Sequence, residues 1–331
     1  MEQINTLELA PIEVVRPSDS LGNGKADSHQ PFITANTVES SLEEIKKHHI
    51  IPVFTKDNEP LISHSDFIEI TADVIGDAFG DEFSQPQIRL SHPVKGRIPE
   101  AKDKPASELL EREKTIYYER MMFVIEIPSV VESIEGSELS LTVGGVKSYT
   151  QDNLFSRSMC DQHFKVFIGF KNKVCTNLCI WTDGLLDDLK VKNAGQLKAS
   201  LKTLIENYNQ NQHLFHLRKL VEHSITEQQF AQIAGRCRMY NHLPSELKKE
   251  IPVIPFGDQQ INTVVKDYYS DKSFCRDDNG NINLWRLYNL FTNANKATYI
   301  DSFLNRSAGA YSFVEQIRWC LEGKNISWYL N

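Results

Sequence analysis

The sequence lacks an excess of basic residues. Its 36 lysines and arginines are outnumbered by 44 aspartates and glutamates, which gives a formal net charge of −8 and a pI of about 5.7. A chain of this charge has no overall positive field that would attract nucleic acid or an anionic membrane surface. Binding to either of these would have to come from a local patch.

Long apolar runs and an ordered cysteine pattern are also missing. No segment has the length and hydrophobicity that a bilayer-spanning helix needs, and the N-terminus has neither the basic start nor the apolar core of a signal peptide. The 6 cysteines follow no repeating spacing. This usage indicates free thiols in a reducing compartment. We therefore expect a cytoplasmic protein that does not associate with a membrane.

No metal-binding pattern is evident. Cys175 and Cys179 lie close in sequence to Cys160 and His163, and cysteine and histidine are the side chains that zinc prefers. Two residues four apart on a strand, however, are separated by about 13 Å, which is too far for one ion. We expect no metal, no cofactor and no catalytic residues, so a binding protein is favoured over an enzyme.

The composition is that of a folded protein. Apolar residues make up 40% of the 331 residues and charged residues 24%, values that are normal for a globular chain with a sizeable core. The polar N-terminal stretch predicts a flexible tail over residues 1–48. A β-rich part is expected over residues 49–190, and a helical part packed on the sheet over residues 191–331.

The strongest strand pattern covers residues 163–188. Two apolar runs, residues 164–170 and 174–181, flank the triplet Lys171-Asn172-Lys173 and predict a hairpin. A three-residue loop would place Phe170 opposite Val174 and make one face of the ribbon apolar. A slip by one residue would turn every side chain of one strand to the opposite face and place polar residues against the apolar row. We therefore prefer the register with the three-residue loop. The other face would either be covered by helices or receive a ligand.

Further strands are predicted upstream and helices downstream. Residues 87–92, 115–127 and 137–149 have the β-branched, aromatic or alternating patterns of strands, with a bulge or close contact at Gly144-Gly145. Beyond residue 188 the apolar period becomes helical, and Thr226 to Gln229 forms a capping box. The sequence therefore predicts an α+β fold, with an antiparallel β-sheet in the first half packed against a helical second half.

The best local basic patch lies around the predicted hairpin. Its lysines could contact phosphates, and an exposed aromatic ring on the same ribbon could stack on bases, as in proteins that bind single-stranded nucleic acid. Our leading hypothesis is binding of single-stranded nucleic acid without catalysis. The candidate residues are Lys147, Lys165, Phe167, Lys171, Lys173 and Asn177.

Two other functions remain open. The acidic net charge and the missing catalytic set also fit a component that binds another protein. Glu100 and Lys102, with one residue between them, match a short element of metal-dependent nucleases, in which a carboxylate holds Mg²⁺ and a lysine steadies the attacking water. Prolines surround this element, whereas nucleases place it on a strand. A nuclease is therefore the third alternative.

Four segments carry a resemblance to a known family. They are HFKVFIGFKNKVCTNLCIWTDG, RLSHPVKGRIPEA, EKTIYYERMMFVIEIP and NINLWRLYNLFTNANKATYIDSFL. These segments resemble an uncharacterised protein family of Bacteroidota that is carried on integrated mobile elements, and the resemblance extends over nearly the whole chain from about residue 50 onward. It implies a mobile-element accessory protein, with DNA or another element protein as partner, and no established activity.

A more distant similarity connects two of these segments. Phage- and plasmid-related proteins carry a cysteine-asparagine element after a strand and a tyrosine-asparagine-threonine helix near the end of the chain. Cys175 and Asn177 match the first element, and residues 288, 289 and 292 match the second. The sequence departs from the pattern at Leu178, where those proteins usually have glycine. The similarity implies no catalytic residue.

Overall fold

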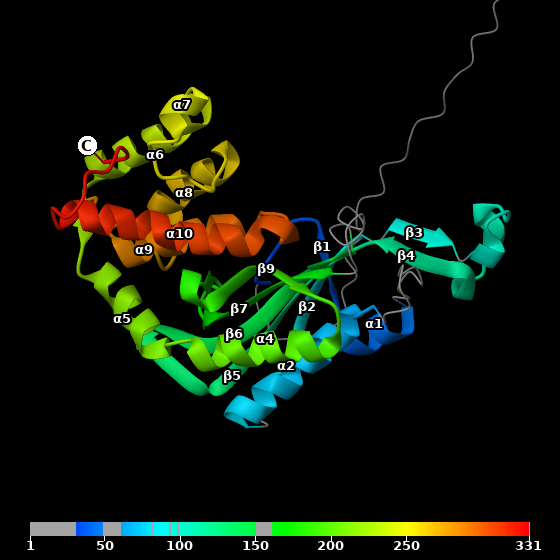
Figure 1. The fold of residues 1–331 in the computed structure, drawn as a ribbon. Coiled ribbons are helices and arrows are strands. Elements are labelled where there is room, and N and C mark those ends of the chain that lie inside the picture. The colour runs from blue at the N-terminus through cyan, green and yellow to red at the C-terminus, as the bar shows by residue number, and fades with distance from the viewer. Residues whose placement is uncertain are drawn as a thin grey trace, which may run out of the picture.

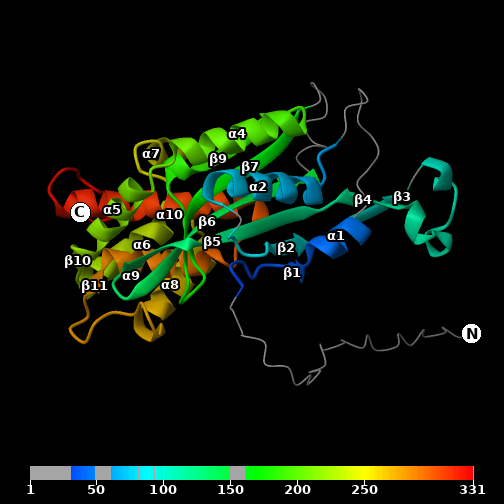
Figure 2. The ribbon, with the colours of Figure 1, turned by 90° about the horizontal axis from the view of Figure 1, so that it is seen from below.

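The computed structural model describes residues 31–48, 61–80, 82–92, 94–97, 99–149 and 161–330. Figures 1 and 2 show a long antiparallel sheet with helices on both faces and a two-stranded arm that projects from one end. Strands dominate the first half of the chain and helices the second. The expected α+β class is confirmed.

The first half contains nine strands among the described residues, together with helices and short 3-10 turns. These elements are β1 (Thr37–Ser40), α1 (Leu42–His48), α2 (His64–Phe79), β2 (Gln87–Ser91), β3 (Val94–Arg97), η1 (Pro99–Ala101), η2 (Ala106–Glu108), η3 (Glu111–Glu113), β4 (Lys114–Tyr118), β5 (Arg120–Ile134), β6 (Ser137–Ser148), β7 (Gln162–Asn172), β8 (Leu178–Cys179), η4 (Thr182–Gly184) and β9 (Leu185–Val191).

The second half is mostly helical. Its elements are α4 (Ala194–Asn207), α5 (Gln210–Val221), β10 (Ser224–Ile225), α6 (Glu227–His242), α7 (Ser245–Lys248), α8 (Asp258–Ser270), β11 (Ile282–Asn283), α9 (Leu284–Asn295) and α10 (Ile300–Leu321). The capping box predicted at Thr226 opens α6: the Thr226 hydroxyl accepts from the Gln229 backbone, and the Gln229 side chain accepts from the Thr226 backbone. None of the described helices is long and apolar enough to span a membrane.

The main sheet has the order β1-β2-β5-β6-β7-β8, and β9 also pairs with β7. β6 runs without interruption through the two glycines, where the sequence predicted a bulge or a close contact. The close contact is the correct alternative. A Cβ atom on Gly145 would lie 2.4 Å from the Phe67 ring of α2, and one on Gly144 would lie 2.8 Å from the Phe167 ring. The register shift occurs instead in β5, between Ile127 and Val131.

The predicted register of the 163–188 hairpin is wrong. Phe170 pairs with Cys179 rather than facing Val174, and Lys171 pairs with Leu178. The longer loop forms because the Asn172 side chain accepts from the Val174 backbone N–H (2.9 Å) and the Asn172 carbonyl accepts from the Thr176 N–H (2.7 Å). Thr176 adopts φ of 58° in this loop. Local asparagine hydrogen bonds therefore override the apolar alternation.

The end of the expected N-terminal tail is part of the folded body. β1 pairs with β2 at the edge of the sheet, α1 follows it, and the side chains of Phe32 and Ile33 are buried. The boundary expected at residue 48 is therefore too late. β1 has only four residues and exposes Val38 and Glu39, so its apolar pattern is too short to identify a strand.

Both faces of the sheet are covered. On one face, Phe123, Val143 and Val166 belong to a core that includes α2 and α4. On the other, Val124 and Phe167 pack with the first half of α10 through Phe303. The predicted packing of the helical half on the sheet holds on both faces, since α10 covers one face and α4, together with α2 from the first half, covers the other. The sheet thus presents neither face to a ligand over these strands.

Candidate functional site

Two of the candidate lysines lie on the adjacent strands β6 and β7, at the same end of these strands. Lys147 on β6 is fully buried, with its ammonium 3.3 Å from Gln162 Oε1 and 4.0 Å from the centre of the Phe164 ring. Lys165 on β7 donates to Asp187 Oδ1 and Asn305 Oδ1, each at 2.7 Å. Asp187 lies on β9 and Asn305 on α10. Both lysines therefore join elements of the fold.

The two lysines of the predicted hairpin tip differ in their surroundings. Lys171 is buried, forms an ion pair with Glu126 on β5 and donates to Gln87 Oε1 at 2.9 Å. Burial acts to raise the pKa of the Glu126 carboxyl, but hydrogen bonds and the charge of Lys171 outweigh it and hold this pKa below its usual value. Lys173 is more exposed and pairs with Glu138. The ammonium group of each lysine has a carboxylate partner.

The two remaining candidates are inside the protein. Phe167 packs beneath α10, and Asn177 donates to the Asn289 carbonyl of α9 at 3.0 Å. The exposed aromatic ring that the hypothesis required is therefore absent at Phe167. Of the six candidates, Lys147, Phe167, Lys171 and Asn177 are buried, while Lys165 and Lys173 are in ion pairs. The structure does not bring these side chains together as an exposed surface.

The two elements of the distant similarity meet in space. Asn289 Oδ1 lies 3.4 Å from Asn172 Nδ2, 3.4 Å from Asn177 Nδ2 and 3.9 Å from Cys175 Sγ, while its own Nδ2 donates to the Trp285 carbonyl at 2.9 Å. One buried asparagine of α9 thus holds the loop between β7 and β8. Because the network lies in the interior, each of its hydrogen bonds contributes to the position of this loop.

Lys296, just after α9, secures the same loop to the N-terminal segment. Its ammonium donates to the Cys175 carbonyl and to Thr176 Oγ1 (3.1 Å), and its carbonyl accepts from the backbone N–H groups of Thr34 and Ala35. Burial raises the pKa of the Cys175 thiol to about 11. The thiol is therefore protonated at neutral pH and is a poor nucleophile. These contacts indicate a structural junction.

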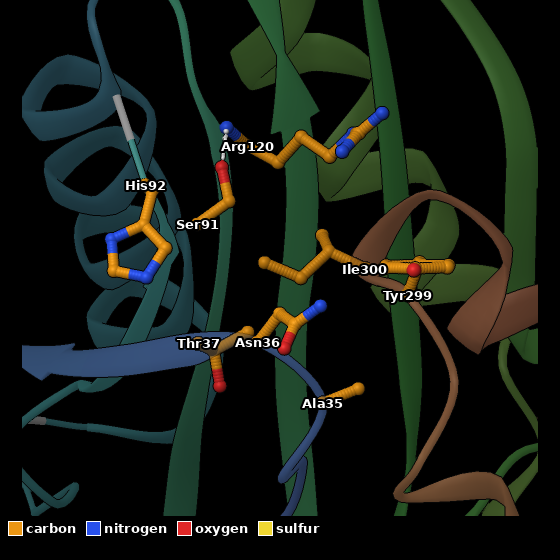
Figure 3. Close-up of a pocket in the computed structure, with 8 residues that line it drawn as sticks. All are labelled: Ala35, Asn36, Thr37, Ser91, His92, Arg120, Tyr299 and Ile300. Atoms are coloured by element: carbon orange, nitrogen blue, oxygen red, sulfur yellow. Dashed lines mark hydrogen bonds between the residues drawn. The ribbon is translucent and has the colours of Figure 1, made fainter. Parts of the chain in front are cut away.

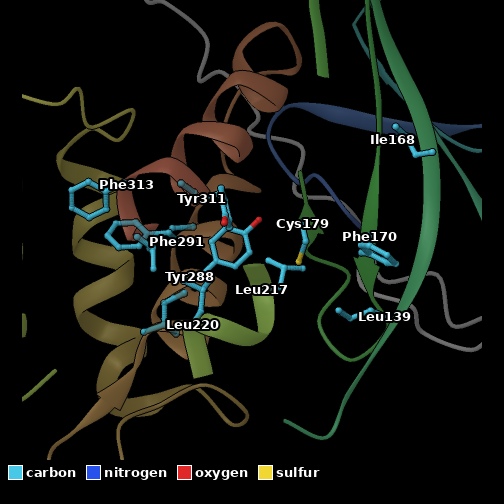
Figure 4. Close-up of a cluster of buried hydrophobic side chains, with 14 of the residues drawn as sticks. Leu139, Ile168, Phe170, Cys179, Leu217, Leu220, Tyr288, Phe291, Tyr311 and Phe313 are labelled. Carbon is cyan, nitrogen blue, oxygen red and sulfur yellow. The ribbon is translucent and has the colours of Figure 1, made fainter. Parts of the chain in front are cut away.

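Tyr288 completes this junction from the side of the helix. Figure 4 shows its ring pointing toward Cys179 and Tyr311, and its centroid lies 6.0 Å from that of Tyr311. Burial, followed by the nearby Cys179 group, raises the pKa of the Tyr288 hydroxyl well above its usual value. The hydroxyl remains neutral and belongs to the packed interior. Cys175 and Cys179 are free thiols, whereas Cys160 lies outside the described residues.

The most prominent surface feature is the arm formed by β3, β4 and the three 3-10 turns η1 to η3. It projects beyond the body in both Figure 1 and Figure 2. Within the described part of the chain, β3 and β4 pair only with each other. At the tip, Glu113 accepts from the Leu110 backbone N–H (3.0 Å) and from Lys104, and the hydrogen bond from Lys104 is the main reason why the pKa of the Glu113 carboxyl is lowered. Leu110 itself is exposed.

The arm is anchored where it enters the body. Glu119, between β4 and β5, is fully buried with Oε2 3.1 Å from His64 Nε2 of α2. The His64 ring stacks on Tyr149 at 4.3 Å, and the Tyr149 N–H donates to the Glu119 carbonyl at 3.1 Å. Arg120 forms an ion pair with Asp301 at the start of α10. The buried contact between His64 and Glu119, the Tyr149 hydrogen bond and the Arg120–Asp301 pair together hold the arm's direction relative to the sheet.

A small open cavity of about 190 Å³ lies beside the root of the arm, the place where Glu119 connects β4 to β5. Figure 3 shows His92 on one side and Tyr299 with Ile300 on the other, with Asn36 and Thr37 below and Ser91 and Arg120 above. The Ser91 hydroxyl accepts from the Arg120 backbone N–H at 2.9 Å. The cavity residues are Ala35, Asn36, Thr37, Ser91, His92, Arg120, Tyr299 and Ile300.

The nuclease element lies at the tip of the arm. Glu100 is in η1 and Lys102 follows it, and both side chains are exposed. Within the described ranges, no group of three or more histidine, cysteine, aspartate or glutamate side chains is arranged to hold a metal ion.

Sequence reasoning missed the cavity and the arm. The cavity residues come from four segments that are far apart in the chain, and none of these segments contains a motif. The arm had one signal, the prolines that surround Glu100 and Lys102, but prolines do not indicate a pair of strands. Strand 94–97, inside this stretch, pairs with strand 114–118 beyond it and forms the projecting ribbon.

The chain was compared with known proteins. No curated protein and no solved structure matches it. One family model matches residues 21–330, and its description is "Domain of unknown function, B. Theta Gene description (DUF3871)". Because this match covers most of the chain, the protein belongs to the DUF3871 family.

Proposed function

We propose that this protein is an accessory protein of a mobile element that binds another protein, and that the arm contacts this partner. The observation that carries the proposal is the arm itself, a two-stranded ribbon with an ordered tip that projects from a sheet already covered on both faces. The association with mobile elements comes from the resemblance of the sequence segments.

The arm contributes little to the core of the protein. Between residues 99 and 114, Ala101 and Glu113 are the buried residues among those whose side chains are described. Ordering a residue costs about 1–2 kcal/mol in backbone entropy, and an isolated two-stranded ribbon is at best marginally stable. A buried root compensates this cost and holds the arm away from the body. Such an element is suited to contact a second molecule.

The surface of the arm favours a protein partner. Its exposed side chains include cations such as Lys102 and Arg112, carboxylates such as Glu100 and Glu108, and the apolar Leu110. A phosphate backbone would select a cationic surface, whereas the mixed charges of the arm resemble the polar rim of a protein interface. The outer edge of each arm strand can also accept a strand from a partner, which provides main-chain hydrogen bonds.

Affinity capture from cells that carry the native gene tests this proposal. We expect a discrete protein to be retained by the wild type after nuclease treatment. Leu110→Asp should lose it, because a carboxylate would enter the apolar contact, and Leu247→Asp, at an exposed leucine on α7, should retain it. Identical capture by Leu110→Asp and the wild type, or loss of the protein on nuclease treatment, would contradict the proposal.

Binding of single-stranded nucleic acid is the second candidate function. The observation that favours it is the exposed Tyr299 ring beside Arg120 and His92 at the cavity, since an aromatic ring near a cation can stack on a base. Fluorescence anisotropy with labelled single- and double-stranded DNA, at low and near-physiological salt with Mg²⁺ present, measures it. Salt-sensitive binding that Tyr299→Ala abolishes would support this function, and no binding at low salt would remove it. Cleavage of the probe that Glu100→Ala abolishes would support the nuclease alternative.

A further inference from the structure

The cavity beside the arm has the size of a single ring system. Its volume is about 190 Å³. Pockets for drug-sized ligands and cofactors are about 300–1,000 Å³, whereas an apolar cavity of about 150 Å³ accepts a benzene ring. Ala35, Ile300 and the ring of Tyr299 provide apolar walls, and Tyr299 is 60% exposed. The cavity therefore fits one side chain better than a cofactor.

The charges around the cavity are balanced. The Arg120 guanidinium is paired with Asp301, and the nearby Arg89 guanidinium donates to Thr37 and lies 3.9 Å from Glu39. Among the described residues, no lysine lines the cavity. A phosphate would have to compete with Asp301 for Arg120. A neutral ring has no such competitor, and it can stack on Tyr299 or pack against the guanidinium plane.

The cavity and the arm are continuous along the chain. His92 lies two residues before β3, and Arg120 begins β5 directly after the residue that ends the arm. The start of β1 at Thr37 and the start of α10 at Ile300 close the other sides. A polypeptide that lies along the arm toward the body would therefore reach the cavity at the arm's root.

We propose that this cavity is the anchor site for one aromatic side chain of the protein partner. The inference rests on the proposed function, because the partner is the one that the arm contacts. Aromatic anchors in pockets dominate the energetics of many protein interfaces, while the surrounding contacts contribute less. The anchored ring would be held between His92 and Tyr299, and the arm would determine the direction of the partner chain.

Small probes test the cavity without the partner. Saturation-transfer NMR would compare N-acetyl-tryptophanamide, N-acetyl-leucinamide and adenosine 5′-monophosphate on the full-length protein. We expect the tryptophan probe to bind in the millimolar range and more tightly than the other two. Tyr299→Ala should weaken its binding about fivefold, the effect of losing one aromatic contact. Tyr269→Ala removes an equally exposed ring on α8 and should change nothing. His92→Ala provides a second variant of the cavity itself.

Each outcome has a distinct meaning. Tighter binding of adenosine monophosphate than of the tryptophan probe would overturn the inference in favour of a nucleotide site. Unchanged binding of the tryptophan probe by both Tyr299→Ala and His92→Ala would overturn it as well. Leu110→Asp tests the arm and should leave probe binding unchanged. A failure of the capture experiment with normal probe binding would therefore refute the proposed function, whereas loss of probe specificity with normal capture would refute the anchor site alone.

Discussion

The central sheet and the root of the arm both pair their charges, but the sheet is covered on both faces whereas the root leaves a cavity open. On β6 and β7, lysines that are close in sequence point into the fold and find carboxylate or amide partners on β2, β5, β9 and α10. At the root of the arm, side chains from four distant segments surround an open cavity. The comparison teaches that charge along a strand does not indicate exposure when both faces of the sheet are covered, since buried charges must be paired.

The largest effect on the free energy of unfolding is expected at Phe167. Its substitution tests whether this ring belongs to the core or to the surface. Phe167→Ala should lower the free energy of unfolding by about 3–5 kcal/mol, because it removes a buried ring and leaves a cavity beneath α10. Phe215→Ala, at a ring that is 56% exposed on α5, serves as the control and should cost less than about 1 kcal/mol. Urea denaturation measures both. Equal effects would mean that Phe167 does not belong to the core.

Lys171 tests whether the charges of the sheet are structural. Lys171→Met leaves Glu126 without its cation and should cost about 2–4 kcal/mol at neutral pH, near the range for breaking a buried pair. Lys173→Met, at a more exposed pair, should cost at most about 1 kcal/mol. A similar loss for both variants would contradict the difference in burial.

The same pair predicts a pH dependence. The pKa of Glu126 is lower in the folded than in the unfolded protein, so its contribution to stability is complete above the unfolded value of about 4.3 and is lost as the pH falls through the folded value. The difference in unfolding free energy between the wild type and Lys171→Met should therefore be largest near neutral pH and shrink below about pH 4. A difference that stays constant down to pH 3 would rule out the ion pair as its source.

Asn289 joins the two elements of the distant similarity. Asn289→Ala should cost about 2–3 kcal/mol, because it leaves the buried amide of Asn172 without this acceptor and removes one of the two acceptors of the Asn177 amide, which keeps the backbone carbonyl of residue 289. Asn211→Ala, at an exposed asparagine on α5, is the matched control and should be nearly neutral. Thermal denaturation with both variants decides whether this junction has the structural role that its contacts indicate.

Tyr299 should have the smallest effect on stability. Because its ring is exposed, Tyr299→Ala should change the unfolding free energy by less than about 0.5 kcal/mol while it reduces capture of the partner. For Phe167→Ala, in contrast, the main effect is expected on the unfolding free energy. A large loss of stability would show that Tyr299 is a packing residue and would weaken the comparison between the two regions.

Some parts of the fold could be predicted from local sequence. The strands around residues 87–91 and 137–148 and the start of α6 followed from alternation and a capping box. The register of β7 with β8 could not, because it depends both on the hydrogen bonds of Asn172 within the loop and on Asn289, more than one hundred residues away, which contacts the same loop. Burial of Lys147 and Lys171 depended on partners from other strands of the sheet. The cavity is lined by residues from four separate segments, the first at residue 35 and the last at residue 300, and these segments meet only in the folded protein.

Site-specific photo-crosslinking in cells that carry the native gene tests the central claim most directly. A photoreactive phenylalanine analogue would replace Leu110 at the arm tip, Tyr299 at the cavity or Val174 in the β7–β8 loop, all three of which are exposed. The account predicts one nuclease-resistant protein adduct from the first two positions and none from Val174. An adduct formed only at Val174, or adducts that nuclease removes, would contradict it and restore the hairpin as the binding surface.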